Sequence, residues 1–144
     1  MGAVVNQRPE LFRAAVPESG VMDMLRFHRF TGGAHWTIET GSSDDAEQFR
    51  FLLGYSPLHN VRRDVEYPAI LVLTADRDER VVPAHSYKYA AALQSQVSKA
   101  RPVLVRIEHQ SGHASSSLHK AMSTAAAMYT FLMRELNAPP RRVR

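Results

Sequence analysis

Three runs of consecutive apolar residues stand out in an otherwise mixed sequence. Residues 69–73 are apolar without interruption, and residues 103–107 form a second run that is broken only by Arg106. Unbroken runs of this length, unlike alternating ones, are typical of parallel strands that are covered on both faces. The third run, Ala14-Ala15-Val16, predicts a short buried strand.

Apolar residues at helical spacing predict three helices. The first begins at the capping pattern of Asp44 and Glu47 and ends at Gly54, and its apolar face consists of Ala46, Phe49, Leu52 and Leu53. The second begins at Pro83, and its expected buried face consists of Ser86, Tyr89, Ala90, Leu93 and Val97. The third is long, and its expected buried face consists of Leu118, Met122, Ala125, Tyr129, Leu132, Met133 and Leu136.

The remaining segments are less regular. Pro9 indicates that residues 6–12 contain a helix end followed by a short turn. Residues 22–30 have some apolar residues at helical spacing, but the segment is short, so helix and loop both stay open. Glycines and serines on both sides of Trp36 predict a loop there.

Strands and helices alternate along the second half of the chain, which predicts an α/β fold with a mostly parallel sheet flanked by helices. In such a fold the loops that leave the carboxyl ends of successive strands lie along one edge of the sheet. One of these loops carries Asp78, and the next one carries His113. We therefore expect the two side chains to meet.

A carboxylate beside an imidazole can fix the tautomer of the imidazole, which then acts as the general base for a nucleophile. In α/β-hydrolases the order along the chain is Ser, then Asp or Glu, then His, so Asp78 and His113 supply the last two members in that order. A solvated turn or a salt-bridge cluster is an equally ordinary use of an Asp-rich loop. The spacing alone leaves these alternatives open.

No nucleophile accompanies this pair in the sequence. The 144 residues contain no Gly-x-Ser-x-Gly, and the nearest candidate, Ser19, has no glycine two places before it. Serines 115–117 suit the N-cap region of the last helix instead. His109 and His113 have ligand-like spacing, but Gly112 argues against the helix that would bring them together on one metal ion, and we expect no metal.

The composition is that of an ordinary globular domain, with 44% hydrophobic and 22% charged residues and no cysteine. Of the net charge of +4, three charges come from Arg141, Arg142 and Arg144, so we expect a basic, disordered tail over residues 139–144 and no nucleic-acid partner. No apolar run is long enough for a membrane helix. The N-terminal residues have no signal-peptide pattern, which makes a cytoplasmic location the expectation.

Several longer motifs resemble the prolyl oligopeptidase family of serine peptidases. They are residues 6–12, residues 20–28 with Val-Met-Asp-Met-Leu, residues 55–61 with Tyr-Ser-Pro-Leu-His-Asn-Val, residues 67–68, and residues 73–83. The resemblance runs from Gly2 to about Asn137. It implies that residues 1–138 are part of an α/β-hydrolase catalytic domain, whose nucleophile precedes Gly2, and that the complete protein also has a β-propeller.

The resemblance also assigns roles to individual residues. Asp78 and His113 match the triad carboxylate and histidine, and Trp36 matches the tryptophan that stacks on the proline ring of the substrate. Val21 and Val81 match apolar walls of the same pocket, and Arg80 matches an arginine that holds a substrate carbonyl. Without the resemblance, Trp36 is equally typical of a core aromatic residue, and Arg80 of a salt bridge to Asp76 or Glu79.

This sequence departs from the family at some positions. It has Ser19-Gly20-Val21 where the family has Val-Gly-Val, Ala34-His35-Trp36 where the family has His-Ala-Trp, and Ala114-Ser115-Ser116 where the family has Gly-Ala-Gly. The family also has a tyrosine that lines the pocket near the position of Thr40. These changes affect the detail of the pocket and leave the matched site residues in place.

The resemblance implies cleavage of short peptides after proline, without a cofactor, once the missing part of the domain is present. The chain alone is expected to be inactive and to expose a sheet edge through which it could self-associate. A non-catalytic remnant that binds a peptide or a partner is one alternative. An esterase-type α/β-hydrolase is another.

Overall fold

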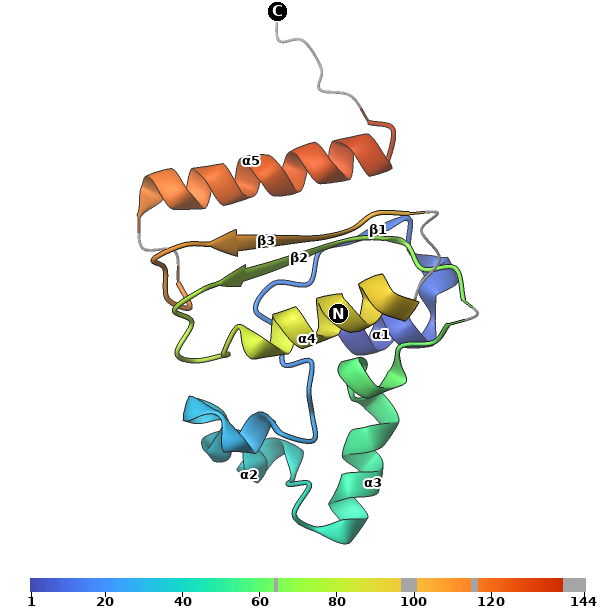
Figure 1. The fold of residues 1–144 in the computed structure, drawn as a ribbon, viewed down its shortest axis with the longest axis vertical. Helices are drawn as coiled ribbons and strands as arrows, with labels where there is room; N and C mark the ends of the chain where they lie inside the picture. Colours follow the sequence, from blue (N-terminus) through green and yellow to red (C-terminus); the bar gives the residue numbers. More distant parts are fainter. Residues whose placement is uncertain (64, 97–100, 115–116, 139–144) are drawn as a thin grey trace, which may run out of the picture.

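The computed structural model describes residues 1–138 except 64, 97–100 and 115–116. Three parallel strands form one sheet in the order β1 (Ala14–Ala15), β2 (Ala69–Ala75) and β3 (Val103–Glu108). Helix α5 (Leu118–Glu135) covers one face, while α1 (Gly2–Gln7) and α4 (Ala84–Gln96) lie on the other (Figure 1). The predicted α/β fold is confirmed.

Strand β2 is the centre of the molecule, and all seven of its residues are buried. Its Ile70 and Val72 pack with Tyr89 and Leu93 of α4 on one face. Its alternate residues Ala69, Leu71 and Leu73 pack with Phe131 of α5 on the other. This arrangement explains the unbroken apolar run, because each face of the strand has its own hydrophobic layer.

Helix α3 (Ala46–Tyr55) is predicted correctly, but its N-cap is not Asp44. The Asp45 carboxylate accepts the backbone N–H groups of Glu47 and Gln48, at 2.9 and 2.8 Å. Asp44 instead pairs with Arg29, at 2.8 Å. Only the residue directly before the helix can reach the free N–H groups of its first turn, and the helix continues one residue past Gly54.

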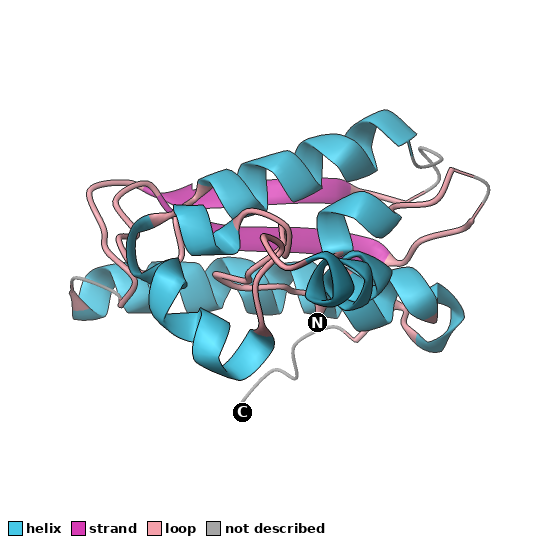
Figure 2. Ribbon diagram, turned by 90° about the horizontal axis from the view of Figure 1, so that it is seen from below, coloured by secondary structure: helices cyan, strands magenta, loops and turns pink. Residues whose placement is uncertain are grey.

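The prediction of a loop around Trp36 is wrong. Residues 31–36 form the 3-10 helix η3 (Thr31–Trp36), which continues into the short helix α2 (Thr37–Thr40). Both lie below the sheet in Figure 1, and Figure 2 views the molecule from that side, so that they are nearer to the viewer than the sheet. The choice left open for residues 22–30 resolves into turns and the 3-10 helix η2 (Phe27–Arg29). Two further 3-10 helices are η1 (Pro9–Leu11), after the break predicted at Pro9, and η4 (Pro57–Asn60).

The predicted buried face of α5 is partly wrong. Four members of the predicted face are the exposed residues Leu118, Met122, Tyr129 and Leu136. The residue most buried against the sheet is Phe131, with Met128 and Leu132 beside it. The helix therefore turns a different face to the sheet, and its most regular apolar stripe stays uncovered.

Some other predictions for the second half of the chain are confirmed, and the rest concern residues outside the described part. The buried face of α4 contains Ser86, Tyr89, Ala90 and Leu93 as predicted. Ser117 is the N-cap of α5 and accepts the N–H of Lys120. Val97, Ser115, Ser116 and the basic tail of residues 139–144 lie outside the described residues. No helix in the described part is long and apolar enough to cross a membrane.

Candidate active site

Two loops at the carboxyl edge of the sheet carry the candidate chemistry. Parallel pairing places the end of β2 beside the end of β3, with Ala75 opposite Glu108 in the register. The chain leaves both strands on this edge, so the loops that follow are neighbours (Figure 1). Backbone hydrogen bonds join them, from Asp76 N–H to the Glu108 carbonyl at 3.1 Å and from Arg77 N–H to the Ser111 carbonyl at 3.0 Å.

The structure brings Asp78 and His113 into direct contact. Nδ1 of His113 lies 2.9 Å from Oδ2 of Asp78 and 3.1 Å from Oδ1. The Asp78 side chain is completely buried, whereas the His113 side chain is 34% exposed. Oδ1 also accepts the backbone N–H groups of Arg80 and Val81, at 3.0 and 2.8 Å, which holds the carboxylate in one orientation.

This geometry fixes the protonation of the imidazole. An ionised carboxylate only accepts hydrogen bonds, so the proton of a neutral His113 must be on Nδ1. The free Nε2 is then an acceptor that can take a proton from a hydroxyl nucleophile. The contact between the two residues is thus as the sequence predicts, and their catalytic role remains a prediction.

The remaining predicted site residues surround one cavity of about 530 Å³. His113 forms part of its lining together with Trp36, Arg80, Val21 and Val81. The other residues of the lining are Ser19, Met24, Phe27, Glu39 and Thr40. Thr40 carries a signal in the sequence, because the family has a pocket tyrosine nearby, whereas Ser19 is notable there only as the nearest candidate for a nucleophile.

Trp36 and Arg80 are both available to a ligand of this cavity. The Trp36 ring stacks on Phe27, with ring centroids 6.4 Å apart and planes 13° from parallel, and the side chain remains partly exposed. Arg80 forms no ion pair with any carboxylate in the described part of the chain, so the alternative of a salt bridge to Asp76 or Glu79 finds no support there. A flat aromatic face and a free guanidinium suit a proline ring and a peptide carbonyl.

A second histidine–carboxylate pair lies beside the first but faces solvent. Nδ1 of His109 is 3.2 Å from Oδ2 of Asp76, and its side chain is 79% exposed. Lys120 donates to the carbonyls of His109 and Gln110, at 2.6 and 3.0 Å, so this pair and Lys120 hold the loop before His113. His109 and His113 thus each pair with a different carboxylate. Among the described residues, no group of three or more potential metal ligands lies close together.

Comparisons with known proteins agree on the family. The profile of the prolyl oligopeptidase family matches residues 1–139. The prolyl endopeptidase of Dictyostelium discoideum is 46% identical over 141 residues, which are 95% of this chain and 19% of that protein. The chain thus spans about a fifth of the length of the curated relatives it matches.

Solved structures give the same result for the fold. One from a study of two prolyl endopeptidases superimposes with a TM-score of 0.90 at 48% identity. The matched region covers 99% of this chain and 20% of the chain in that structure. Prolyl oligopeptidase B from Galerina marginata, bound to a 35mer substrate, superimposes with a TM-score of 0.88 at 36% identity, over 97% of this chain and 21% of its own.

Proposed function

The chain belongs to the prolyl oligopeptidase family, and on this premise we propose that it is the part of a prolyl endopeptidase that supplies two members of a Ser-Asp-His triad and most of a proline pocket. His113 takes the proton of a serine that these 144 residues do not supply in a Gly-x-Ser-x-Gly motif. Asp78 holds the tautomer of His113. The observation that carries the proposal is the 2.9 Å contact between these two residues at the cavity that contains Trp36 and Arg80.

The substrate follows from the chemistry of the cavity. Trp36 stacks on a proline ring, whose rigidity keeps the entropic cost of binding low. Val21 and Val81 enclose the ring, and Arg80 donates to a carbonyl near the cleaved bond. The substrate class is therefore short peptides that contain proline, cut on its carboxyl side through an acyl-enzyme.

The isolated chain should have negligible peptidase activity. Loss of the nucleophile in a serine peptidase lowers kcat by on the order of a million-fold. A blocked Gly-Pro anilide should therefore be cleaved by the purified chain no faster than by buffer. Cleavage that disappears with His113→Ala would contradict this part of the proposal.

The decisive experiment restores the missing part. Residues 1–139 would replace the matching segment of the Dictyostelium discoideum prolyl endopeptidase, which supplies the rest of the domain. We expect the chimera to cleave the Gly-Pro anilide and to hydrolyse a simple ester far less efficiently. His113→Ala in the chimera should lower kcat by on the order of a million-fold. A folded chimera that cleaves only the ester would favour an esterase.

We also infer that the uncovered surfaces of the chain receive the rest of the catalytic domain, beyond which the resemblance implies a β-propeller. Strand β1 pairs with β2, and the described part of the chain provides no strand for its other edge. The apolar stripe of α5, formed by Leu118, Met122, Tyr129 and Leu136, is 51–78% exposed. Met128 and Leu132 of the same helix pack in one cluster with Ala14 and Val16.

The stripe lies next to Leu132 on the helix surface and away from Phe131, as the helical repeat of 3.6 residues per turn dictates. The helix therefore presents apolar side chains on the side of β1, where the sheet is also open. Further strands beside β1 and a helix beside α5 would cover both surfaces at once.

A further inference from the structure

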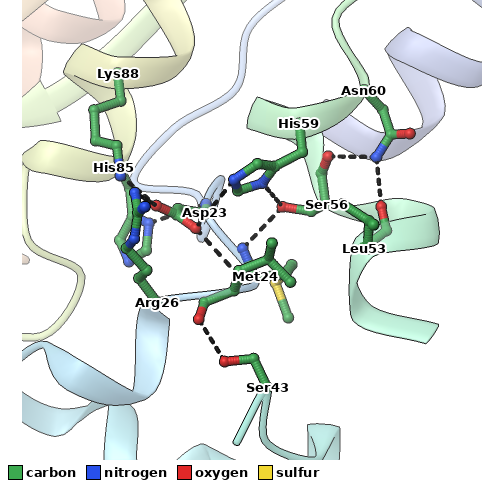
Figure 3. A network of polar contacts seen from close by, with 11 residues as sticks. Asp23, Met24, Arg26, Ser43, Leu53, Ser56, His59, Asn60, His85 and Lys88 are labelled. Atoms are coloured by element: carbon green, nitrogen blue, oxygen red, sulfur yellow. Dashed lines mark hydrogen bonds and ion pairs between the residues drawn. The ribbon is translucent and has the colours of Figure 1, made fainter. Parts of the chain in front are cut away.

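The two most distinctive motifs of the sequence take no part in the contact between Asp78 and His113. They are Val-Met-Asp-Met-Leu at residues 21–25 and Tyr-Ser-Pro-Leu-His-Asn-Val at residues 55–61. The structure brings them together around Asp23, whose side chain has no exposed surface (Figure 3). Side chains from α4 and from the segment of η4 point at this one residue and its neighbours.

Three consecutive backbone N–H groups of this segment are bound by side chains. The N–H of Asp23 donates to Nδ1 of His85, at 3.1 Å. The N–H of Met24 donates to Oγ of Ser56, at 3.0 Å, and that of Leu25 to Oδ1 of Asp23, at 3.2 Å. Buried backbone groups outside helices and strands need such partners, so these side chains fix the path of the segment.

The carbonyl groups of the segment are held as well. The Leu58 N–H donates to the carbonyl of Met22, at 2.8 Å. Oγ of Ser43 donates to the carbonyl of Leu25, at 2.6 Å. The backbone of residues 22–25 is therefore tied to segments far away in the sequence.

Ionic contacts hold the carboxylate at the centre. Lys88 forms an ion pair with Oδ2 of Asp23, and Arg26 lies 3.8 Å from the same oxygen. Burial opposes ionisation of Asp23, but the hydrogen bond and charge of Lys88 outweigh it, so the pKa of Asp23 lies below its ordinary value. The residue is thus a buried anion with a matched cation, an arrangement that tolerates little movement.

Ser56 links the second motif to the first. Its Oγ accepts the Met24 N–H at 3.0 Å and also forms a hydrogen bond with Nδ1 of His59, at 2.8 Å. Nε2 of His59 faces Oδ1 of Asp23, 4.0 Å away. Met24, Ser56, His59 and Asp23 form a closed ring of polar contacts.

Val21 and Met24 stand on either side of Asp23, and both line the cavity that contains Trp36 and His113. We propose that Asp23 and Ser56 are positioning residues, which hold the apolar wall formed by Val21 and Met24 and thereby set the affinity of the cavity for proline peptides. The inference rests on the proposed function, because it takes the cavity as the proline site. The two residues contact the wall and not the substrate, so they affect binding and leave the Asp78–His113 pair unchanged.

Ser56→Ala in the 144-residue chain tests this, with Tyr89→Phe as the matched control. Tyr89 is also buried, and its hydroxyl donates to Oδ1 of Asn6 at 2.9 Å, outside the network. The chain has a single tryptophan, Trp36, so its fluorescence reports binding of a blocked Ala-Ala-Pro amide. Methyl NMR signals of Val21 and Met24 report the wall itself.

For Ser56→Ala we expect the Kd to rise about tenfold, the effect of one lost hydrogen bond, and the Val21 and Met24 methyl signals to shift. Tyr89→Phe should lower Tm but leave the Kd and both methyl signals nearly unchanged. The Nδ1 tautomer of His113 should be the same in both variants. If both variants weaken binding in proportion to their loss of Tm, the role is structural and the proposal fails.

Two further outcomes are distinguishable. If the wild-type chain binds no proline peptide, the proposed substrate is wrong for the isolated chain, and the methyl signals still decide whether the network holds the wall. If Ser56→Ala does not fold, Lys88→Gln replaces it, since this side chain is 34% exposed and its loss removes the cation from Asp23. Unchanged methyl signals in Lys88→Gln would overturn the proposal.

Discussion

His85 accepts a hydrogen bond from the backbone N–H of Asp23 while only 1% of the residue is exposed, so its imidazole must stay neutral to keep the bond. Burial lowers the pKa of His85 to about 4, against 6.5 for the ordinary side chain. Between these two values the unfolded chain binds a proton that the folded chain does not bind. The stability therefore falls as the pH is lowered through this window.

We expect the free energy of unfolding to decrease between pH 7 and pH 4, with a contribution of about 3 kcal/mol from His85. Asp23, whose pKa is lowered, adds a loss in the same direction only below its ordinary value of 3.8. Urea unfolding at several pH values measures the slope. His85→Asn keeps an acceptor near the Asp23 N–H without titrating and should flatten the slope, so an unchanged slope would contradict this account.

A second prediction concerns the tautomer of His113. In Asp78→Asn, the amide oxygen can still accept from Arg80 and Val81, which turns the amide N–H₂ toward His113. Nδ1 then becomes the acceptor, and the proton moves to Nε2, where it blocks general-base chemistry. Long-range ¹H–¹⁵N NMR should show the change from the Nδ1–H to the Nε2–H tautomer.

Asp76→Asn is the matched control, because Asp76 faces His109 and not His113. It should leave the tautomer of His113 as in the wild type. In the chimera, Asp78→Asn should lower kcat by about four orders of magnitude, and Asp76→Asn by much less. Equal losses in the two variants would mean that Asp78 has no special role.

The sequence correctly predicts burial where the helices that cover an apolar surface are part of these 144 residues. The run at residues 69–73 is buried on both faces because α4 and α5 are present. The buried face of α5 is predicted wrongly in part, because apolar periodicity shows on which side of a helix the apolar residues lie and not which element covers that side. No pattern in the sequence predicts the contacts of the Asp23 network, since Ser56 and His85 are 33 and 62 positions away and follow no repeat.

Some residues of the candidate site could also be predicted from the sequence, and others could not. Asp78 and His113 follow successive strands, so topology alone predicts that they meet. Met24 and Phe27 reach the cavity through turns and 3-10 segments that no periodicity specifies. The roles of Trp36 and Arg80 could be predicted only through the family resemblance.

A third prediction follows from the uncovered stripe of α5. The exposed side chains of Leu118, Met122 and Tyr129 form an apolar surface that should make the isolated chain self-associate. The triple variant Leu118→Gln, Met122→Gln, Tyr129→Gln should shift the chain toward the monomer in analytical ultracentrifugation without lowering Tm. In the chimera the same substitutions should lower stability by several kcal/mol, since that stripe would then be buried.

The triple variant needs a control on α5 itself. Thr130→Gln serves, because Thr130 is exposed and its hydroxyl donates to the Ala126 carbonyl of its own helix, at 2.7 Å. It should leave both the association of the isolated chain and the stability of the chimera nearly unchanged. Self-association that persists in the triple variant would point to the open edge of β1 instead.

The last prediction concerns two adjacent glycines before Trp36. A Cβ on Gly33 would lie 1.9 Å from the Phe27 carbonyl oxygen, whereas a Cβ on Gly32 would meet no atom within 4 Å. Gly33→Ala must therefore push η3 away from η2 and separate the stacked rings of Trp36 and Phe27. Gly32→Ala is the matched control and should be neutral. We expect Gly33→Ala to lower Tm, to shift the Trp36 emission to longer wavelength and to abolish binding of the Ala-Ala-Pro amide. If the two variants behave alike, the close approach of these segments is not what positions Trp36.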